Sequence, residues 1–345
     1  MNPISKVRIL FLLLCLVASV SRGQVAGMST LSVLDMSSSA RTAALGMDYL
    51  ALSDNDLSIG IDNPSFIDQK YHNTLILNYV GLFRGANFGA VSYGRHIKNL
   101  GDFLFGLRFD SYGTFKGYDE TEVPTGSFFA ADYVFSVGWG RHIDSCFSLG
   151  VNFKPVLSQY EGYTAFAFGL DVAGSYVSPS KQFASTLMAR NIGAQIFTFD
   201  GTTEKLPFEL SLSLSYKLAN APFRFYFAAT ELQKWDLRYD DPLHPLTAYD
   251  PYDDTYTTET WLHEALDKTF RHAVFGVELT FNNVFFARVG FNYRQTQETY
   301  GISNINTSGF SYGFGLRKKK FEVAFSRNNY YLGKAPNYLT VALRL

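Results

Sequence analysis

The sequence is poor in cysteine, in charge and in long hydrophobic runs. It holds two cysteines in 345 residues, so a disulfide-rich scaffold is excluded. Charged residues make up only 18% of the chain and the formal net charge is −1. This balance excludes the strongly basic surface typical of proteins that bind nucleic acid, so no nucleic-acid partner is expected. After the first two dozen residues, no segment offers the roughly 18 consecutive apolar residues that a transmembrane helix requires.

The one long apolar run lies near the start of the chain, at Ile9–Val20. It is too short to cross a bilayer as a helix, it follows two basic residues, and small residues come after it. This layout predicts a secretory signal peptide over residues 1–23, with cleavage before Gln24. Cys15 lies inside the run after a leucine, where a lipoprotein signal would carry a small residue, so no lipidation is expected. Cys146 is then the single cysteine of the exported protein, and no intrachain disulfide is predicted.

Aromatic residues are abundant, and apolar and polar residues are interleaved. The chain has 32 Phe and 22 Tyr, yet its mean hydropathy is close to zero. Residues 208–217 give the clearest pattern, because Phe, Leu and Tyr alternate there with Glu, Ser and Lys. Residues 147–154, 284–294 and 338–345 alternate in the same way. Such a period of two predicts strands with one apolar and one polar face.

Fourteen segments carry this pattern, and most of them have the length of a membrane-crossing strand, about nine to eleven residues. An even number of strands suits a single-chain bacterial barrel. The sequence therefore predicts an all-β fold, a 14-stranded antiparallel transmembrane β-barrel over residues 71–345. The expected strands are 73–80, 87–96, 102–111, 128–141, 146–156, 164–177, 183–191, 207–217, 222–230, 270–281, 284–294, 307–317, 319–328 and 338–345.

The connections between these segments alternate in length. Those after even-numbered strands are short, as at 97–101, 142–145 and 282–283. Those after odd-numbered strands are mostly longer. Outer-membrane barrels show this asymmetry because their periplasmic turns are short and their extracellular loops are long. We therefore expect an integral protein of the outer membrane with both termini on the periplasmic side. The longer connections are 112–127, 192–206, 231–269 and 295–306.

Charged residues of the predicted strands fall on the face opposite the Phe and Leu side chains. An Arg on the lipid-facing side would cost about 2–4 kcal/mol at the bilayer midplane, so these charges are expected to line the lumen. A barrel of fourteen strands is too wide to be filled by its own side chains alone. Residues 24–70 are the segment available to fill it, as an N-terminal plug. The inward charges are Arg108, Asp110, Asp171, Glu209, Arg224, Glu278, Arg288 and Glu322.

The plug segment contains its own signals. Small residues around Arg41 predict a short helix that ends at Gly46, and Asn63-Pro64 ends any regular structure after it. Arg41, Asp54 and Asp56 are expected to pair with lumen charges of opposite sign. The alternative places them in solvent at the periplasmic rim.

These stretches carry a family resemblance. Ala40–Gly46, the turn Asp54-Asn55-Asp56 and Asn63-Pro64 resemble the N-terminal signature of the FadL-like outer-membrane barrels, and more closely that of the PorV/PorQ proteins of the type IX secretion system. Met47 and Ser65 depart from that signature, where a glycine and an alanine are usual.

The resemblance implies a non-enzymatic outer-membrane component that anchors a PorZ-like surface protein. This protein would work beside PorU and PorV, in the complex that attaches cargo to surface lipopolysaccharide. Two alternatives stay open. One is a FadL-like transporter of hydrophobic small molecules, and the other is a PorV-like shuttle for secreted cargo. A lumen lined by charged or small residues disfavours an apolar substrate path.

The longest connection, residues 231–269, differs from the rest of the chain. It carries ten acidic residues, and residues 258–268 are expected to form a short helix. The acids lack the Asp-x-Asp-x-Asp-Gly order of a calcium loop, so no metal is assigned to them. Aromatic residues among charges are typical of protein-contact surfaces, so this loop is expected to bind a partner. Its aromatic candidates are Trp235, Tyr239, Tyr249, Tyr252, Tyr256 and Trp261.

Two short turns echo each other, with the aromatic–Gly–Arg–His–Ile sequences at 93–97 and 139–143. Tyr93, Arg95, Trp139 and Arg141 are predicted to anchor the barrel at the membrane interface, in preference to a metal site formed by the histidines. The basic turn at 317–320 is read in the same way, as a contact to lipid headgroups. No nucleophile elbow or zinc-binding helix is present, so no enzyme, cofactor or metal is expected.

Overall fold

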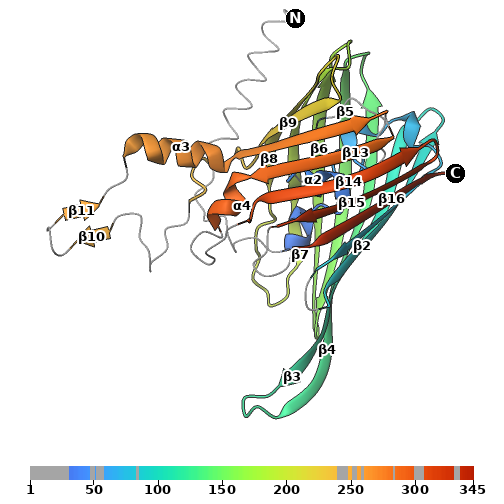
Figure 1. Ribbon diagram of the computed structural model, residues 1–345. Coiled ribbons are helices and arrows are strands. Elements are labelled where there is room, and N and C mark those ends of the chain that lie inside the picture. The colour runs from blue at the N-terminus through green and yellow to red at the C-terminus, as the bar shows by residue number, and fades with distance from the viewer. Residues whose placement is uncertain are drawn as a thin grey trace, which may run out of the picture.

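The computed structural model describes residues 31–46, 51, 58–82, 85–238, 248–250, 255–257, 260–282, 284–298, 307–329 and 335–345. Fourteen strands close into an antiparallel barrel in which β1 pairs with both β2 and β16 (Figure 1). Each barrel strand pairs with the next barrel strand along the chain, so the barrel is an up-and-down one. The predicted 14-stranded barrel is confirmed. The predicted signal peptide, residues 1–23, lies outside the described residues.

Barrel strands differ in length between the two halves of the wall. The first half carries the long strands, and the second half carries strands of seven to nine residues. The barrel strands are β1 (Thr74–Gly81), β2 (Asn87–Ile97), β3 (Gly101–Tyr118), β4 (Pro124–His142), β5 (Phe147–Tyr160), β6 (Tyr163–Val177), β7 (Phe183–Phe197), β8 (Glu209–Lys217), β9 (Phe223–Ala229), β12 (Ala273–Phe281), β13 (Phe285–Asn292), β14 (Phe310–Lys318), β15 (Phe321–Asn328) and β16 (Asn337–Arg344).

Residues that alternate in type along a strand also alternate between the outer surface and the interior of the barrel. Outward side chains such as Phe147, Leu149 and Phe285 are about half exposed, although they are apolar. The charged residues on the opposite face are buried, apart from Arg108, which is partly so. An exposed belt of Phe and Leu around a charged interior is the inverse of a soluble protein and suits a barrel in lipid.

The connection expected at 112–127 is mostly strand. β3 and β4 continue past the barrel as a two-stranded ribbon, which ends with Tyr118 opposite Pro124 (Figure 1). A bulge between Ser111 and Gly113 marks the place where the ribbon leaves the wall. Both faces of the ribbon are largely exposed, so the residues show no period of two and the prediction of a loop was wrong there. β7 likewise runs on to Phe197, into the predicted connection at 192–206.

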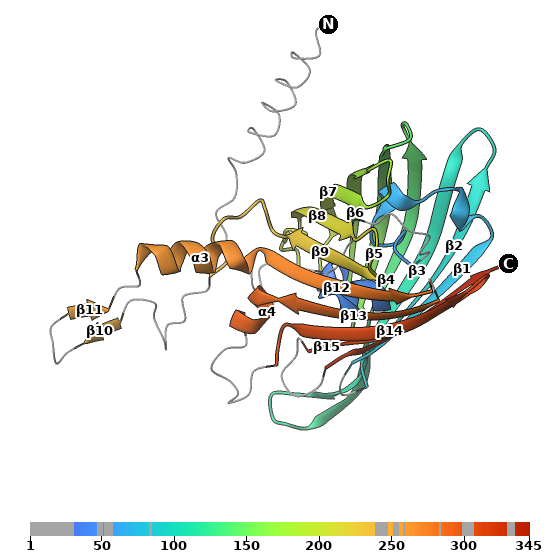
Figure 2. The same cartoon turned by 45° about the horizontal axis from the view of Figure 1, so that its top comes forward.

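Two helices replace strand ends that the sequence suggested. α3 (Trp261–Arg271) occupies the first residues of the strand expected from 270, so β12 begins only at Ala273. α4 (Tyr293–Glu298) follows β13, where strand was expected to residue 294 and a loop after it. Figure 2 shows α3 projecting beyond the strands. The helix predicted at 258–268 is confirmed with shifted bounds. Between β9 and α3, β10 (Ala248–Asp250) and β11 (Thr255–Thr257) form a small separate sheet.

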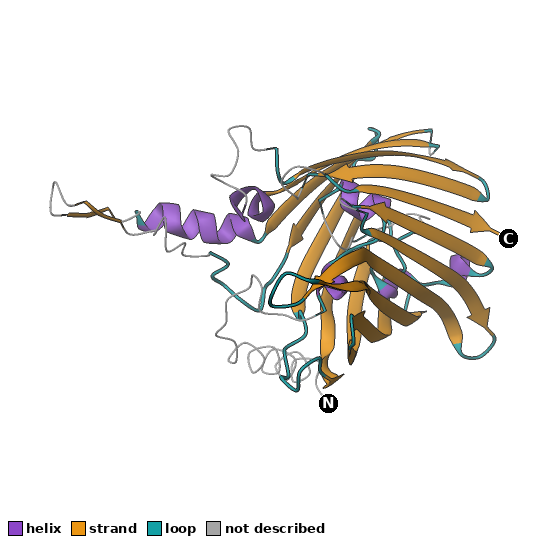
Figure 3. Cartoon of the chain, turned by 90° about the horizontal axis from the view of Figure 1, so that it is seen from below, coloured by secondary structure: helices purple, strands orange, loops and turns teal. Residues whose placement is uncertain are grey.

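The described residues of the N-terminal segment, 31–46, 51 and 58–71, lie inside the barrel, where Figure 3 shows their short helices. The segment contains η1 (Ser32–Asp35), α2 (Ala40–Ala44), η2 (Pro64–Phe66) and η3 (Gln69–Tyr71). Leu31 and Val33 pack against the wall near the long-connection end, together with Leu206. Tyr71 packs near the short-turn end, against residues that include Ala342. The segment therefore extends from one half of the lumen to the other.

Local sequence explains the breaks in this segment. The Ser39 hydroxyl accepts a hydrogen bond from the Arg41 amide at the start of α2, and Gly46 has a φ of 69° just after its end. The predicted helix and its end at Gly46 are confirmed. Asn63 caps η2 in the same way, and Pro64 occupies the first helical position, where its missing N–H costs nothing. Within the described ranges, no helix is long and apolar enough to cross a membrane.

Candidate functional site

The barrel wall carries glycines where the N-terminal segment lies against it. A Cβ atom built on Gly150 would lie 2.1 Å from the carbonyl carbon of Pro64, and one on Gly290 would lie 2.1 Å from that of Leu45. A Cβ on Gly94 would lie 2.1 Å from the carbonyl oxygen of Tyr71. No side chain fits at these distances. The wall therefore has a seat shaped for the segment, on strands that lie on different sides of the lumen.

Polar side chains of the wall hold the backbone of the segment near α2. The Thr340 hydroxyl accepts from the Ala40 amide at 2.9 Å, and the Ser311 hydroxyl donates to the Ala44 carbonyl at 3.0 Å. Further towards the start, Arg190 donates to the Leu34 carbonyl at 3.1 Å. Arg108 donates to the carbonyl of Met36. Backbone groups that the segment's short helices leave unsatisfied are thus paired with wall side chains.

Arg41 lies at the centre of a buried charge cluster. Its Nη2 donates to Glu278 Oε1 at 2.8 Å and to the Tyr226 hydroxyl at 3.0 Å. Arg288 Nε donates to the other oxygen of Glu278 at 2.7 Å, and the Arg288 guanidinium stacks 4.5 Å from the ring centroid of Phe286. The Glu278 carboxylate therefore joins two guanidinium groups, one from the segment and one from the wall.

Asn63 and Ser65 join the segment to a second part of the wall. The Asn63 side chain accepts from the Ser65 amide and hydroxyl, and its Nδ2 lies 3.3 Å from the Thr186 hydroxyl. The hydroxyls of Ser65 and Ser175 are 2.5 Å apart. The Ser65 hydroxyl thus adds a contact to β6. Pro64 is buried against Gly150.

A further cluster lies on β5–β8. Lys154 Nζ is 2.7 Å from Asp171 and 2.6 Å from the amide oxygen of Asn191. Arg190 Nη1 is 3.3 Å from Glu209. Each buried charge has a partner of the opposite sign, which a low-dielectric interior requires.

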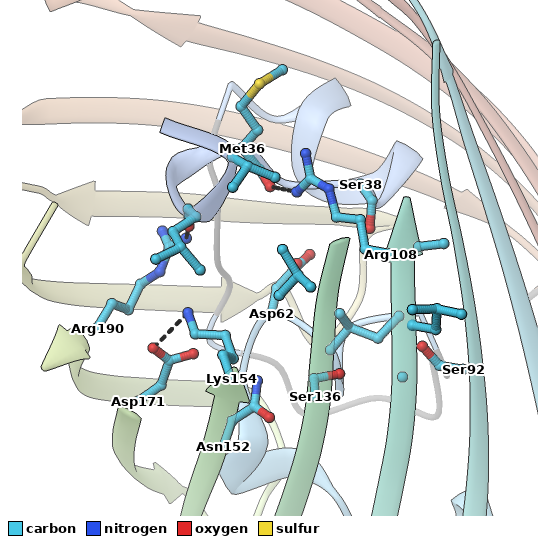
Figure 4. A pocket seen from close by; sticks show the side chains of 17 residues that line it. Met36, Ser38, Asp62, Ser92, Arg108, Ser136, Asn152, Lys154, Asp171 and Arg190 are labelled. Carbon is cyan, nitrogen blue, oxygen red and sulfur yellow. Dashed lines mark hydrogen bonds and ion pairs between the residues drawn. The ribbon is translucent and has the colours of Figure 1, made fainter. Parts of the chain in front are cut away.

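A cavity of about 60 Å³ remains between the segment and the wall formed by β2–β7 (Figure 4). The wall supplies charged and amide groups, including Arg108, Asn152 and Lys154, while the segment supplies apolar side chains such as Val33 and Met36. The cavity has room for a few water molecules, whereas a benzene-sized guest occupies a cavity of about 150 Å³. This cavity therefore does not admit an aromatic ring in this conformation.

The aromatic candidates of the long connection are only partly described. Trp235 stacks on His272, with ring centroids 5.8 Å apart, and it is 67% exposed. Trp261 begins α3 and is 78% exposed. Tyr239 and Tyr252 lie outside the described residues, as do Asp54 and Asp56 in the plug segment. Tyr249 and Tyr256 pair through their backbones in β10 and β11.

The polar face of α3 is fixed to the rest of the molecule. Lys268 Nζ lies 2.7 Å from Glu264 and 2.8 Å from Asp236, and Arg238 Nη2 lies 2.9 Å from Glu264. The hydrogen bond from Lys268, together with the charges of Lys268 and Arg238, lowers the pKa of the Glu264 carboxyl. The other face of the helix is apolar and exposed. It presents Leu262, Leu266 and Phe270, and Trp261 is exposed at the start of the helix.

The predicted interface anchors lie at the short-turn end, with contacts to neighbouring turns. The Tyr93 hydroxyl and an Arg95 guanidinium nitrogen both donate to the side-chain oxygen of Asn73, at 3.0 and 2.7 Å. Trp139 Nε1 donates to the Leu100 carbonyl at 3.0 Å. Arg141 is exposed. Among the described residues, no group of three or more His, Cys, Asp or Glu side chains is placed to hold a metal.

Sequence reasoning did not identify the glycine seat or the wall hydroxyls. Glycine at inward positions of the alternation, as at Gly150 and Gly290, was the available signal, because a strand interior otherwise disfavours glycine unless another backbone approaches it closely. Thr340 and Ser311 carry no such signal, because a luminal hydroxyl is ordinary in a barrel strand.

No known family model matches the chain, and no curated protein matches its sequence. Solved structures do match its fold. A mutant of the monoaromatic hydrocarbon channel TodX aligns over 90% of this chain and 99% of its own, with 12% identity and a TM-score of 0.50. The toluene transporter TodX of Pseudomonas putida aligns over 93% and 98%, with 11% identity and a TM-score of 0.47. A FadL homologue of Pseudomonas aeruginosa aligns over 90% and 98%, with 12% identity and a TM-score of 0.44. At such low identity the comparison concerns architecture alone, and the chain is a closed 14-stranded antiparallel β-barrel with the fold of the hydrocarbon channel TodX.

Proposed function

We propose that this protein is an integral outer-membrane barrel whose N-terminal segment gates a passage for small hydrophobic molecules. The membrane location follows from the exposed Phe and Leu belt and from strands that leave no open sheet edge. The class of solute is suggested by the fold shared with a monoaromatic hydrocarbon channel.

The observation that carries this proposal is the position of the cavity. It lies between the segment and the wall, and the segment's contribution to it is largely apolar. Displacement of the segment away from β2–β7, including Ile61 and Asp62, which line the gap close to Ser65 in the chain, would widen this gap, which is now too small for an aromatic ring. Passage therefore requires movement of the segment, and a segment bound covalently to the wall would block it.

The test is a reversible lock. The hydroxyls of Ser65 and Ser175 are 2.5 Å apart, so Ser65→Cys with Ser175→Cys, in a Cys146→Ser background, places two thiols within disulfide reach. Cells that depend on this barrel would be given radiolabelled toluene or a long-chain fatty acid. Uptake is expected to fall several-fold in the oxidised double variant and to recover after reduction. The single-cysteine variants control for the substitutions.

Unchanged uptake with a fully formed disulfide would contradict gating by this segment. If uptake with the oxidised and with the reduced protein equals that of cells without the barrel, the proposal that this protein transports hydrophobic molecules is contradicted.

Docking of a surface protein is a second candidate function, and the exposed apolar face of α3 favours it. Four large apolar side chains between residues 261 and 270 are exposed, while salt bridges fix the opposite face of the helix. The small polar cavity also suits a barrel that stays closed. In this account the barrel anchors a PorZ-like protein of a type IX attachment complex, beside PorU and PorV and close to lipopolysaccharide. The family resemblance of Ala40–Gly46 and Asn63-Pro64 is the basis for these partner names.

Purification of the tagged barrel from gently solubilised outer membranes tests docking. A stoichiometric surface protein should copurify, and it should be lost in the variant Trp261→Ala/Leu262→Ala/Leu266→Ala. Phe115→Ala/Tyr118→Ala/Val123→Ala, which removes three exposed apolar side chains from the ribbon of β3 and β4, is the matched control. If the barrel copurifies with lipid alone, the docking proposal is contradicted and the transport proposal stands. In both accounts the barrel is non-catalytic and needs no cofactor.

A further inference from the structure

A basic pocket lies at the short-turn end of the barrel, where β14 turns into β15 and η3 ends the N-terminal segment. It is an open pocket of about 390 Å³. Six cationic side chains line it, against the single carboxylate of Glu322. The cations are Lys70, Arg317, Lys318, Lys319, Lys320 and Arg344.

Most of this positive charge is not compensated locally. Arg317 pairs with Glu322 through two hydrogen bonds of 2.8 and 3.1 Å, and Lys70 lies 2.8 Å from Asp68. The three consecutive lysines of the turn have no ion pair with any described residue. Arg344 donates from Nη2 to the Lys70 carbonyl at 3.2 Å, while its buried Nε has no partner in the described part of the chain. Donors and charge are thus available to an anion.

The same pocket has an apolar side. Val284, Phe321 and Ala342 line it, and Phe321 is 40% exposed. Phe285 and Phe314, on the strands next to this turn, are exposed on the outer face of the wall. Phe321 is on the outer face of the wall, whereas Ala342 faces the lumen beside Tyr71, so the pocket lies over the rim of the barrel, between the apolar belt and a cluster of cations.

We propose that this pocket binds the phosphate of a glycerophospholipid headgroup, with the acyl chains lying along the outer face of β13–β15. Arg and Lys are the usual ligands of phosphate oxygens. Short turns face the periplasm in barrels of this class, and the leaflet there consists of phospholipid. Free phosphate offers the same charge but makes no use of the apolar side. The inference rests on membrane insertion, which belongs to the proposed function, and it is independent of transport and docking.

The test compares two charge-matched variants of the full-length barrel in zwitterionic detergent. Bound phosphatidylglycerol is counted by native mass spectrometry during a titration. Lys318→Gln/Lys319→Gln/Lys320→Gln is expected to weaken binding at least tenfold. Lys98→Gln/Lys181→Gln/Lys205→Gln removes three exposed lysines elsewhere and should leave binding within about twofold. A parallel titration with inorganic phosphate alone separates the two sources of phosphate.

Lys319→Asn guards against an effect of misfolding. Lys319 has a φ of 48°, a conformation that asparagine adopts more readily than lysine, so this variant should keep or improve stability. It should still weaken phosphatidylglycerol binding several-fold. Equal binding by the two triple variants would overturn the proposal, and so would inorganic phosphate binding as tightly as the lipid. Uptake is measured separately on the same variants, so that a failure of transport leaves the lipid result intact.

Discussion

At the scale of single residues, Glu278 links the N-terminal segment to the wall. It accepts from Arg41 and Arg288 and lies 3.3 Å from the Tyr226 hydroxyl, and all four groups are buried. Sequence analysis proposed Arg41 as a luminal residue but offered no specific partner for it. Glu278 lies 237 positions further along the chain, and only closure of the barrel brings the two together.

Glu278→Gln is expected to destabilise the barrel by about 3 kcal/mol, because it removes a buried carboxylate that accepts hydrogen bonds from the guanidinium groups of Arg41 and Arg288. The free energy of unfolding can be measured from the heat-modifiable mobility of the folded barrel in detergent. Glu298→Gln is the control, since its 3.8 Å pair with Arg294 lies near the surface and should contribute less than about 1 kcal/mol. Equal losses in the two variants would contradict the role given to Glu278.

Gly150→Ala should displace the N-terminal segment, because the new Cβ would lie 2.1 Å from Pro64 and 2.3 Å from the Ser65 amide nitrogen. Trypsin should then cleave after Arg41, which is buried in the parent protein. Gly89→Ala is the matched control, since no atom lies within 4 Å of the Cβ built there. If trypsin treats both variants like the parent, the wall glycines are not a seat for the segment.

At the scale of elements, the strands were predictable where one face meets lipid and the other meets the lumen. Residues 147–154 and 208–217 show this two-sided environment and alternate clearly. The ribbon at the ends of β3 and β4 does not, since solvent lies on both of its faces and backbone pairing alone extends it. The sequence also suggested strand at 270–271 and 293–294, where α3 and α4 occupy those positions.

The stability with which α3 is held against the rest of the molecule is expected to depend on pH. The pKa of Glu264 is lowered in the folded protein. Its ion pairs therefore stabilise the position of α3 fully above the ordinary carboxyl pKa of about 4.3, and this stabilisation is lost as the pH falls through the pKa of the folded state. Its partner Lys268 has a raised pKa, so the lysine stays charged throughout that range. Hydrogen exchange of residues 261–271 should therefore speed up between neutral pH and the acidic side of pH 4, relative to the barrel strands.

Glu264→Gln should show faster exchange in this helix already at neutral pH and a smaller further change on acidification, since Asp236 still pairs with Lys268. An unchanged acid response in that variant would show that Glu264 does not fix α3.

At the scale of the whole molecule, a closed sheet and an internal segment depend on each other. The wall supplies glycines, hydroxyls and charges at positions that match residues 34–71, and the segment fills a lumen that the wall's side chains leave open. The barrel and its width could be predicted from the count of alternating segments. The seat could not, because it depends on which strands meet across the lumen.

The most direct test of this account is cysteine cross-linking in intact outer membranes. Ser65→Cys with Ser175→Cys, without Cys146, should form a disulfide in nearly all molecules and shift the electrophoretic mobility of the unfolded chain. Ser65→Cys with Ser311→Cys should not, because Ser311 contacts Ala44 instead of residue 65. Cross-linking of the first pair alone is the predicted result. No cross-link in the first pair, in a protein that inserts and folds, would contradict a lumen occupied by the N-terminal segment.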